Sequence, residues 1–120
     1  MLKKTLMGTA IAAALMAGGA FADTVKIANV AELSGAGAAA GSVWADGVRL
    51  AVEEINASGG ILGKEIYLAE YDSQTDPQNS RAMVQKAIDQ GTYVLLGTVY
   101  SSSTVVNMLV AMQNGMPQLT

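Results

Sequence analysis

The chain has 120 residues, a formal net charge of -3, and neither cysteine nor histidine. This length allows one small domain. The missing residue types exclude disulfides, thiol nucleophiles, histidine-dependent triads and the usual cysteine and histidine zinc sites. The mild acidity, without a basic stripe, argues against nucleic acid as a partner.

The first residues have the pattern of a secretory signal peptide. Lys3 and Lys4 precede an apolar run, and residues 20–22 (Ala-Phe-Ala) have the small residues of a cleavage site. The apolar run is shorter than the ~20 residues that a membrane span needs. We therefore expect residues 1–22 to be a signal peptide that is cleaved after Ala22, and the mature protein to be free in the periplasm.

The mature part alternates between strand and helix patterns. Short apolar or alternating runs predict strands, and apolar residues at spacings of three and four predict helices. The expected elements are a strand at 24–31, a helix from Ser42 that ends in 56–60, a strand at 64–72, a helix from Asp76-Pro77, a strand at 93–97, a helix that opens at 100–104, and a strand at 116–120.

Several details of these elements can be predicted as well. Asp76 followed by Pro77 is typical of a helix start, with a side-chain acceptor at the N-cap and a fixed φ after it. The continuous apolar run at 93–97 predicts a strand that is covered on both faces. The inward residues expected for the second helix are Val84, Ala87 and Ile88, and those for the third are Val105, Val106, Leu109 and Met112.

Strands that alternate with helices predict an α/β fold, with a doubly wound parallel sheet and right-handed crossovers. In the flavodoxin-like order the first strand lies between the second and the third. Ligands then bind at the carboxyl ends of the first and third strands, where the strand order reverses. The loops expected there are 32–41 and 98–103. The chain stops on its fourth strand without a closing helix, so we expect residues 23–120 to be the front part of a larger protein.

The serine-rich turn at 100–104 is the strongest candidate for a ligand site. It places hydroxyls and free backbone N–H groups at a helix N-terminus, where about half a positive charge resides, and this suits a carboxylate or a phosphate. Ser102 or Ser103 could instead simply cap the helix. Three consecutive serines exceed what a cap needs, which favours Ser101 as a ligand-binding residue.

The first loop also matches a dinucleotide fingerprint through Gly35, Gly37 and Ala40. A dinucleotide site needs an acidic residue roughly 20 positions later, whereas Glu70 and Asp72 lie considerably further on. We therefore expect no cofactor. The glycines are better explained by a close approach to a small ligand or by tight packing of strand and helix.

A metal site is not expected either. Asp72, Gln74 and Asp76 have the spacing of a calcium loop, but Pro77 stands where the sharp turn needs glycine. Asp76 is better used as a helix cap, and no pair of carboxylates suggests acid–base catalysis.

Four stretches together resemble a known family. They are ELSGAGAAAG, GVRLAVEEINASGGILGKEI, YDSQTDPQNSRAMVQKAID and LLGTVYSSSTVVNMLVAMQNGMPQLT. They are similar to the amino-terminal lobe of type I periplasmic binding proteins, and most of all to the leucine/isoleucine/valine-binding family of ABC importers. The resemblance covers essentially all of residues 23–120.

The resemblance implies two α/β lobes that hold an amino acid between them and deliver it to a membrane permease, without catalysis. It implies that Ser101 binds the ligand's carboxylate, flanked by Tyr100 and Ser102. We add Ser34, from the first loop. Ala40 stands where several relatives carry an aromatic residue.

Some alternatives stay open. Trp44 could replace the aromatic residue that is missing at Ala40, or could pack the first helix on the sheet. An amide- or urea-binding relative, the sensing domain of a receptor, and an exported enzyme on the same fold are the alternative functions.

Overall fold

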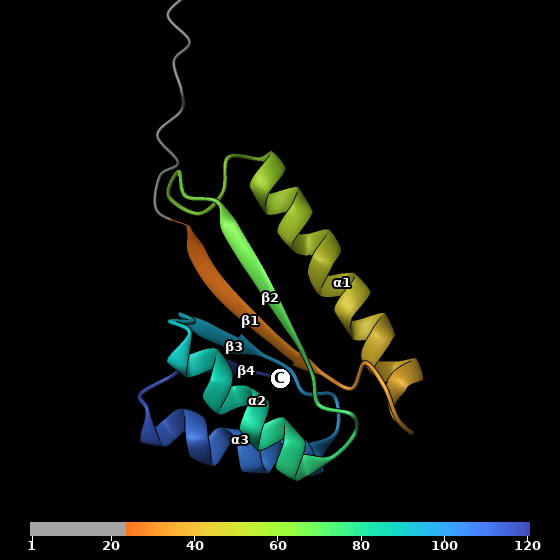
Figure 1. The fold of residues 1–120 in the computed structure, drawn as a ribbon. Helices are drawn as coiled ribbons and strands as arrows, with labels where there is room; N and C mark the ends of the chain where they lie inside the picture. Colours follow the sequence, from red (N-terminus) through yellow and green to blue (C-terminus); the bar gives the residue numbers. More distant parts are fainter. Residues whose placement is uncertain (1–23) are drawn as a thin grey trace, which may run out of the picture.

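The computed structural model describes residues 24–120 (Figure 1), so the expected signal peptide and its cleavage site lie outside the described residues. The elements alternate as predicted. They are β1 (Val25–Ala31), α1 (Ala38–Ala57), β2 (Ile66–Asp72), α2 (Pro77–Asp89), β3 (Val94–Leu96), α3 (Ser101–Gln113) and β4 (Gln118–Leu119).

The four strands form one parallel sheet in the order β2-β1-β3-β4, which confirms the predicted topology. Val25 pairs with Ile66 of β2, and Ile27 pairs with Val94 of β3. Helix α1 lies on one face of the sheet, and α2 and α3 lie together on the other (Figure 1). All crossovers are right-handed, and the one from β1 to β2 runs in the opposite direction along the sheet to the one from β2 to β3. Helix α1 therefore lies on the opposite face of the sheet from α2 and α3.

The hydrophobic core lies between the sheet and the pair of helices α2 and α3. Apolar side chains from the strands meet small and branched side chains from both helices, and this burial from water is the main driving force for folding. The buried members are Ala28, Val30, Tyr71, Val84, Ala87, Leu95, Val110 and Ala111.

Helix α1 begins at Ala38, four residues before the expected start at Ser42. Alanine has the highest helix propensity, so the alanines that follow Gly37 extend the helix into the glycine-rich loop. The other end is close to the prediction, because α1 ends at Ala57 before two glycines with positive φ. Asn56 then ties the helix to β2, since its side chain donates to the carbonyl of Ile66 and accepts from its amide.

The predicted inward face of α3 is wrong. Val105, Leu109 and Met112 are exposed, and Val106 is half-buried. The buried face instead carries Ser103, Asn107, Val110 and Ala111. The reason is a polar contact that periodicity does not reveal: Asn107 and Ser80 of α2 are both buried, and the Asn107 amide nitrogen lies 2.9 Å from the Ser80 hydroxyl. This pair and the small Ala111 turn the apolar stripe away from α2.

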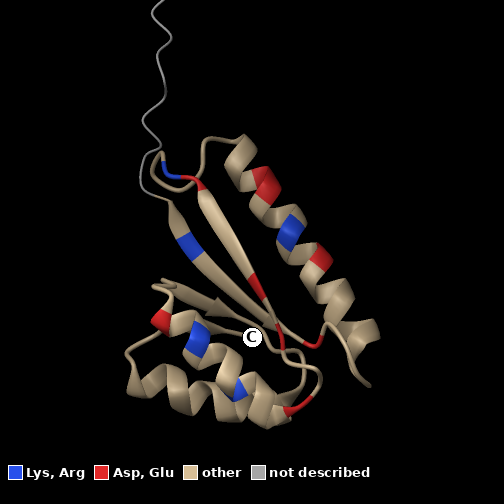
Figure 2. Cartoon of the chain, viewed as in Figure 1, with Lys and Arg blue, Asp and Glu red and all other residues tan. Residues whose placement is uncertain are grey.

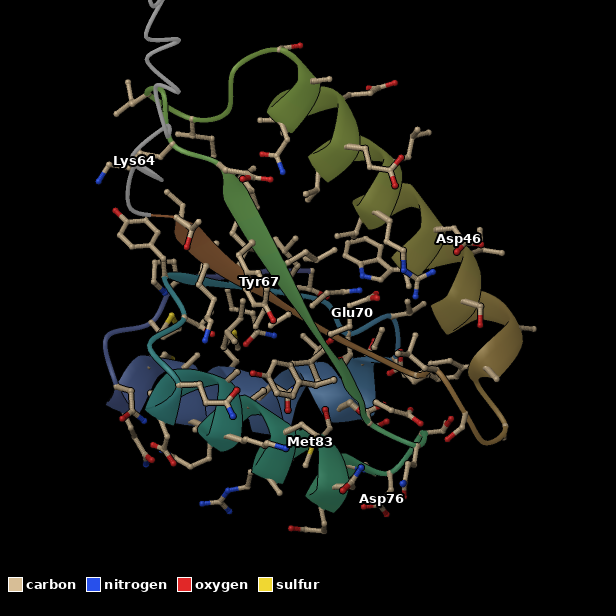
Figure 3. All side chains as sticks on the ribbon, turned by 45° about the horizontal axis from the view of Figure 1, so that its top comes forward. Asp46, Lys64, Tyr67, Glu70, Asp76 and Met83 are labelled. Atoms are coloured by element: carbon tan, nitrogen blue, oxygen red, sulfur yellow. The ribbon has the colours of Figure 1, made fainter. Side chains whose placement is uncertain are left out.

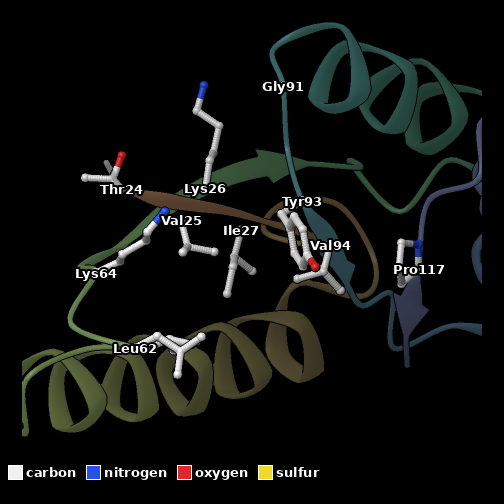
Figure 4. Close-up of a pocket in the computed structure, with 11 residues that line it drawn as sticks. Thr24, Val25, Lys26, Ile27, Leu62, Lys64, Gly91, Tyr93, Val94 and Pro117 are labelled. Atoms are coloured by element: carbon white, nitrogen blue, oxygen red, sulfur yellow. The ribbon is translucent and has the colours of Figure 1, made fainter. Parts of the chain in front are cut away.

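Strand β3 is covered fully on one face only, contrary to the expectation of cover on both. Leu95 is buried beneath α2 and α3, whereas Val94 and Leu96 point to the other face and are only half-buried. Helix α1 packs mainly on β1 and β2. An open pocket of about 600 Å³ lies on this side of the sheet, at the amino ends of β1 and β3 (Figure 4).

No helix within residues 24–120 is long and apolar enough to cross a bilayer.

Candidate functional site

The loops after β1 and β3 meet at the carboxyl end of the sheet, as the predicted strand order requires. Glu32, directly after β1, is completely buried. Its two carboxylate oxygens accept hydrogen bonds from the backbone amides of Val99 (3.2 Å) and Tyr100 (3.4 Å). The loops also touch at Gly37, where an added Cβ would lie 2.7 Å from the Tyr100 ring. The predicted switch point is therefore assembled.

Asp72, the last residue of β2, holds the first loop from the other side. One carboxylate oxygen accepts from the amides of Leu33 (3.0 Å) and Ser34 (3.1 Å), and the other accepts from the Ser34 hydroxyl (2.6 Å). The amide of Gln74 donates to the same carboxylate at 2.8 Å. A single side chain thus fixes both the start of its own loop and the loop that follows β1.

These contacts set the charge state of Asp72. Partial burial pushes the pKa of the carboxyl upward, but the hydrogen bonds from Ser34, Gln74 and Leu33 outweigh burial and hold the pKa below its ordinary value. Hydrogen bonds to the ionised form favour that form. Asp72 is therefore a stable anion that keeps its acceptors for the loop amides.

Thr75 completes the contact between the two loops. Its hydroxyl donates to the carbonyl of Ser34 at 2.7 Å and accepts from the amide of Gly37 at 2.9 Å. Gln74 and Thr75 both have positive φ, 55° and 59°. This conformation is costly for a β-branched residue, and such strain persists only where the surrounding contacts hold it. Asp72 and Thr75 supply those contacts.

The serine turn lies at the N-terminus of α3. Tyr100 is the N-cap residue, and no side chain makes a capping hydrogen bond to the helix. The alternative in which Ser102 or Ser103 caps the helix is therefore wrong. Ser101 and Ser102 are exposed. Their backbone N–H groups have no hydrogen-bond acceptor within residues 24–120. Exposed hydroxyls and unpaired amides at a helix N-terminus can bind an anion.

A cluster of threonine hydroxyls connects this turn to the ends of β3 and β4. The hydroxyl of Thr104 donates to the carbonyl of Thr98 at 3.2 Å, and the two side-chain oxygens lie 3.1 Å apart. The hydroxyl of Thr120, just after β4, donates to the same carbonyl at 2.8 Å. The ends of β3 and β4 are thereby tied to the first turn of α3.

The four candidate ligand residues lie around this switch point but differ in what they can offer. Ser101 and Ser102 have free hydroxyls within the described part of the chain, and the amide of Tyr100 is already bonded to Glu32. Ser34 is exposed, but its hydroxyl proton goes to Asp72. Ser34 can therefore offer a ligand an acceptor and no donor.

Trp44 packs α1 against the sheet. Its indole N–H donates to the buried Asn29 at 2.9 Å, and the ring lies near Gly97 at the end of β3. Asn29 in turn donates to Glu70, which is labelled in Figure 3, and Glu70 also accepts from Arg49. The hydrogen bond and charge of Glu70 raise the pKa of Arg49 above its ordinary value. The packing role that the sequence allowed for Trp44 thus agrees with its contacts.

Sequence reasoning missed the roles of Glu32 and Asp72. The signal was present, since each is an acidic residue at the carboxyl end of a strand: Asp72 ends β2, and Glu32 directly follows β1. Figure 2 shows acidic residues gathered at this end of the sheet. Lys26 and Lys64 line the pocket of Figure 4, which is remote from the serine turn.

The first loop is not free to hold a pyrophosphate. Its amides at Leu33, Ser34 and Gly37 already donate to Asp72 and Thr75. The space beside Gly35 is filled as well, because an added Cβ would lie 2.6 Å from the carbonyl oxygen of Gln74. Gly35 and Gly37 serve close packing between loops, whereas the sequence alone suggests a close approach to a ligand or packing of strand and helix.

The acidic residues near the loop have assigned partners. Asp76 caps α2 by accepting from the amide of Asn79 at 2.7 Å, as predicted, and Asp72 binds the loop amides. Within residues 24–120, no group of three or more acidic side chains is placed to hold a metal ion.

Comparison with known proteins agrees with this geometry. The family model described as "Periplasmic binding protein" matches residues 24–120. The chain is 38% identical to the leucine-specific-binding protein of Salmonella typhimurium over 101 residues, which cover 84% of this chain and 27% of the relative. It is 36% identical to the Leu/Ile/Val-binding protein of Escherichia coli, over 71% of this chain and 23% of the relative. The chain thus spans about a quarter of the length of these relatives.

A solved structure gives the same result. The branched-chain amino acid transporter substrate binding protein LivJ of Streptococcus pneumoniae, in complex with isoleucine, superimposes with a TM-score of 0.78 at 32% identity. The match covers 80% of this chain and 28% of that structure.

Proposed function

The chain belongs to the periplasmic binding protein family, and on that premise we propose that it is the amino-terminal part of the first lobe of an exported solute-binding protein. The ligand is a branched-chain or closely related amino acid. The second lobe closes over it by a hinge motion, and the closed protein delivers it to an ABC permease in the membrane. The names of the relatives, and the isoleucine bound to one of them, support this ligand class.

The observation that carries the proposal is the serine turn. The Ser101 hydroxyl and the amides of Ser101 and Ser102 have no acceptor within residues 24–120, and they lie at the start of a helix of 13 residues. A carboxylate that binds there accepts charge-assisted hydrogen bonds and gains from the helix dipole. Every α-amino acid carries this group, so the turn supplies affinity for the class and leaves the choice of side chain to other residues.

On this proposal the protein binds its ligand without catalysis, and the chemistry of the described residues supports that role. A nucleophile or a general base needs a partner that tunes its pKa. Asp72 is held ionised by loop amides, and the chain has no histidine or cysteine. The groups at the switch point bind and orient, and none of them is arranged to transfer a proton to a ligand.

A ligand panel on the mature full-length protein tests the proposal. The panel contains leucine, isoleucine, valine, other amino acids, short amides, urea and a nicotinamide dinucleotide, measured by thermal shift. A ligand at one hundred times its dissociation constant stabilises by ~2.7 kcal/mol. We expect a branched-chain amino acid to give the largest shift. A shift with amides or urea alone would indicate an amide- or urea-binding protein of the same family. A shift with the dinucleotide alone would support an enzyme.

Ser101→Ala tests the assigned contact. Removing one donor to a charged acceptor costs ~1–3 kcal/mol, which corresponds to a loss of affinity of roughly five- to 150-fold. Ser58→Ala is the matched control, because Ser58 is an exposed serine at the far end of α1 whose hydroxyl bonds only the carbonyl of Glu54. Titration calorimetry of both variants with leucine measures the difference. Equal affinity of the two variants would remove Ser101 from the site.

A further inference from the structure

We propose that Glu32 is a positioning residue, which holds the serine turn in the orientation that receives the ligand's carboxylate. This inference rests on the function proposed above. Glu32 is completely buried, so it does not touch the ligand itself. It acts through the two residues that directly precede Ser101.

The contacts of Glu32 fix the backbone of the turn. Its two oxygens accept from the amides of Val99 and Tyr100, one oxygen to each amide. A buried carboxylate is costly unless it is hydrogen-bonded. Any other conformation of residues 99–100 leaves this anion without its partners, so the energy of the buried charge opposes movement of the turn.

The backbone of Glu32 is itself held from the other side. Gly41 of α1 lies so close that an added Cβ would be 2.1 Å from the Glu32 carbonyl oxygen. Glu32 is therefore clamped between α1 and the start of α3. Through this one residue, the ends of β1 and β3 keep a fixed relative position at the switch point.

Glu32 also decides which amides remain for the ligand. It takes those of Val99 and Tyr100, and it leaves those of Ser101 and Ser102 unpaired among the described residues. Its negative charge disfavours a second anion close to the first pair of amides. The ligand's carboxylate is thereby directed to the outer pair, next to the Ser101 hydroxyl.

The test compares Glu32→Gln with Glu53→Gln in the mature full-length protein. Gln retains the length of the side chain but replaces one acceptor by a donor, which faces an amide N–H. Glu53 is the control, because it is exposed on α1 and has no hydrogen bond from its side chain within residues 24–120. With L-leucine as the probe, we expect Glu32→Gln to weaken binding about five- to tenfold and Glu53→Gln to leave it unchanged.

Two further readouts separate positioning from a loss of stability. In Glu32→Gln without ligand, the NMR amide proton signals of Val99 and Tyr100 move upfield, because a charged acceptor has been removed. In a double-mutant cycle with Ser101→Ala, the effect of Glu32→Gln on leucine binding shrinks, since residues in one network are not additive. Unaltered leucine affinity in Glu32→Gln, unmoved amide signals, or full additivity would each overturn the proposal.

The wild type alone provides a test that does not depend on the folding of a variant. Without ligand, the amides of Val99 and Tyr100 exchange slowly with solvent and those of Ser101 and Ser102 exchange fast; leucine then slows the second pair. Fast exchange at Val99 and Tyr100 would refute the Glu32 contact. A wild type that binds no amino acid of the panel would refute the proposed function, and the exchange pattern without ligand then shows separately whether the contact exists.

Discussion

Gly41→Ala should destabilise the protein although alanine favours helix. Position 41 lies inside α1 and is buried against β1. An added Cβ would lie 2.1 Å from the carbonyl oxygen and 2.6 Å from the carbonyl carbon of Glu32. Both are backbone atoms, so the helix or the strand must shift. Overpacking of this kind costs typically ~1–3 kcal/mol, whereas the gain in helix propensity is at most about 1 kcal/mol.

Gly47→Ala is the control for this prediction. Gly47 lies in the same helix, six residues further on, and an added Cβ there meets nothing within 4 Å. That variant gains the propensity alone and should be ~0.5–1 kcal/mol more stable than the wild type. Both variants gain helix propensity, so we expect them to differ in urea unfolding by the overpacking cost alone, ~1–3 kcal/mol. A Gly41→Ala protein as stable as Gly47→Ala would refute the close approach of α1 and β1.

Two further predictions concern side chains away from this contact. Asp72→Asn should cost ~1 kcal/mol at neutral pH, a value reduced by solvent screening at a half-exposed site. The pKa of Asp72 is lower in the folded than in the unfolded state, so this contribution is present above about pH 4 and is lost as the pH falls through the folded pKa. The free energies of unfolding of the wild type and the variant, measured in urea, should therefore converge in acid and not in base. Ser80→Ala and Asn107→Ala should each lower the free energy of unfolding by ~1–3 kcal/mol, because each leaves a buried partner unpaired. The double variant should lose less than the sum of the two. A purely additive result would mean that the pair is not coupled.

The topology could be predicted because it depends on features that are local in the sequence. The strand runs, the Asp76 cap with Pro77, and the glycines after Ala57 each act within a few residues. Once strands and helices alternate, the handedness of crossovers leaves few arrangements of the sheet. The order β2-β1-β3-β4 is the flavodoxin-like order that was assumed from this alternation, and the meeting of the two loops follows from that order.

The errors arose where a contact between distant residues decides the outcome. The apolar period of α3 indicated Val105, Leu109 and Met112 as its inner face, but the buried bond between Ser80 and Asn107, 27 residues apart, orients the helix differently. In the same way, helix propensity alone does not show that Glu32 needs the space at Gly41. The site was located by topology, but its supports were not, because carboxylates that bind amides 39 or 67 residues away leave no period in the sequence.

The two missed carboxylates explain why a loop with the fingerprint of a dinucleotide site fails to form one. Each lies at the carboxyl end of a strand, Asp72 at the end of β2 and Glu32 directly after β1. Each satisfies the amides of a neighbouring loop: Asp72 those of the first loop, and Glu32 those that precede α3. A phosphate that entered the first loop would have to displace an aspartate that hydrogen bonds keep ionised. At the serine turn, by contrast, the amides of Ser101 and Ser102 have no acceptor in the described part of the chain. The carboxylate of Asp72 thus occupies the amides of the glycine loop, whereas the amides of Ser101 and Ser102 remain available to bind the carboxylate of a ligand.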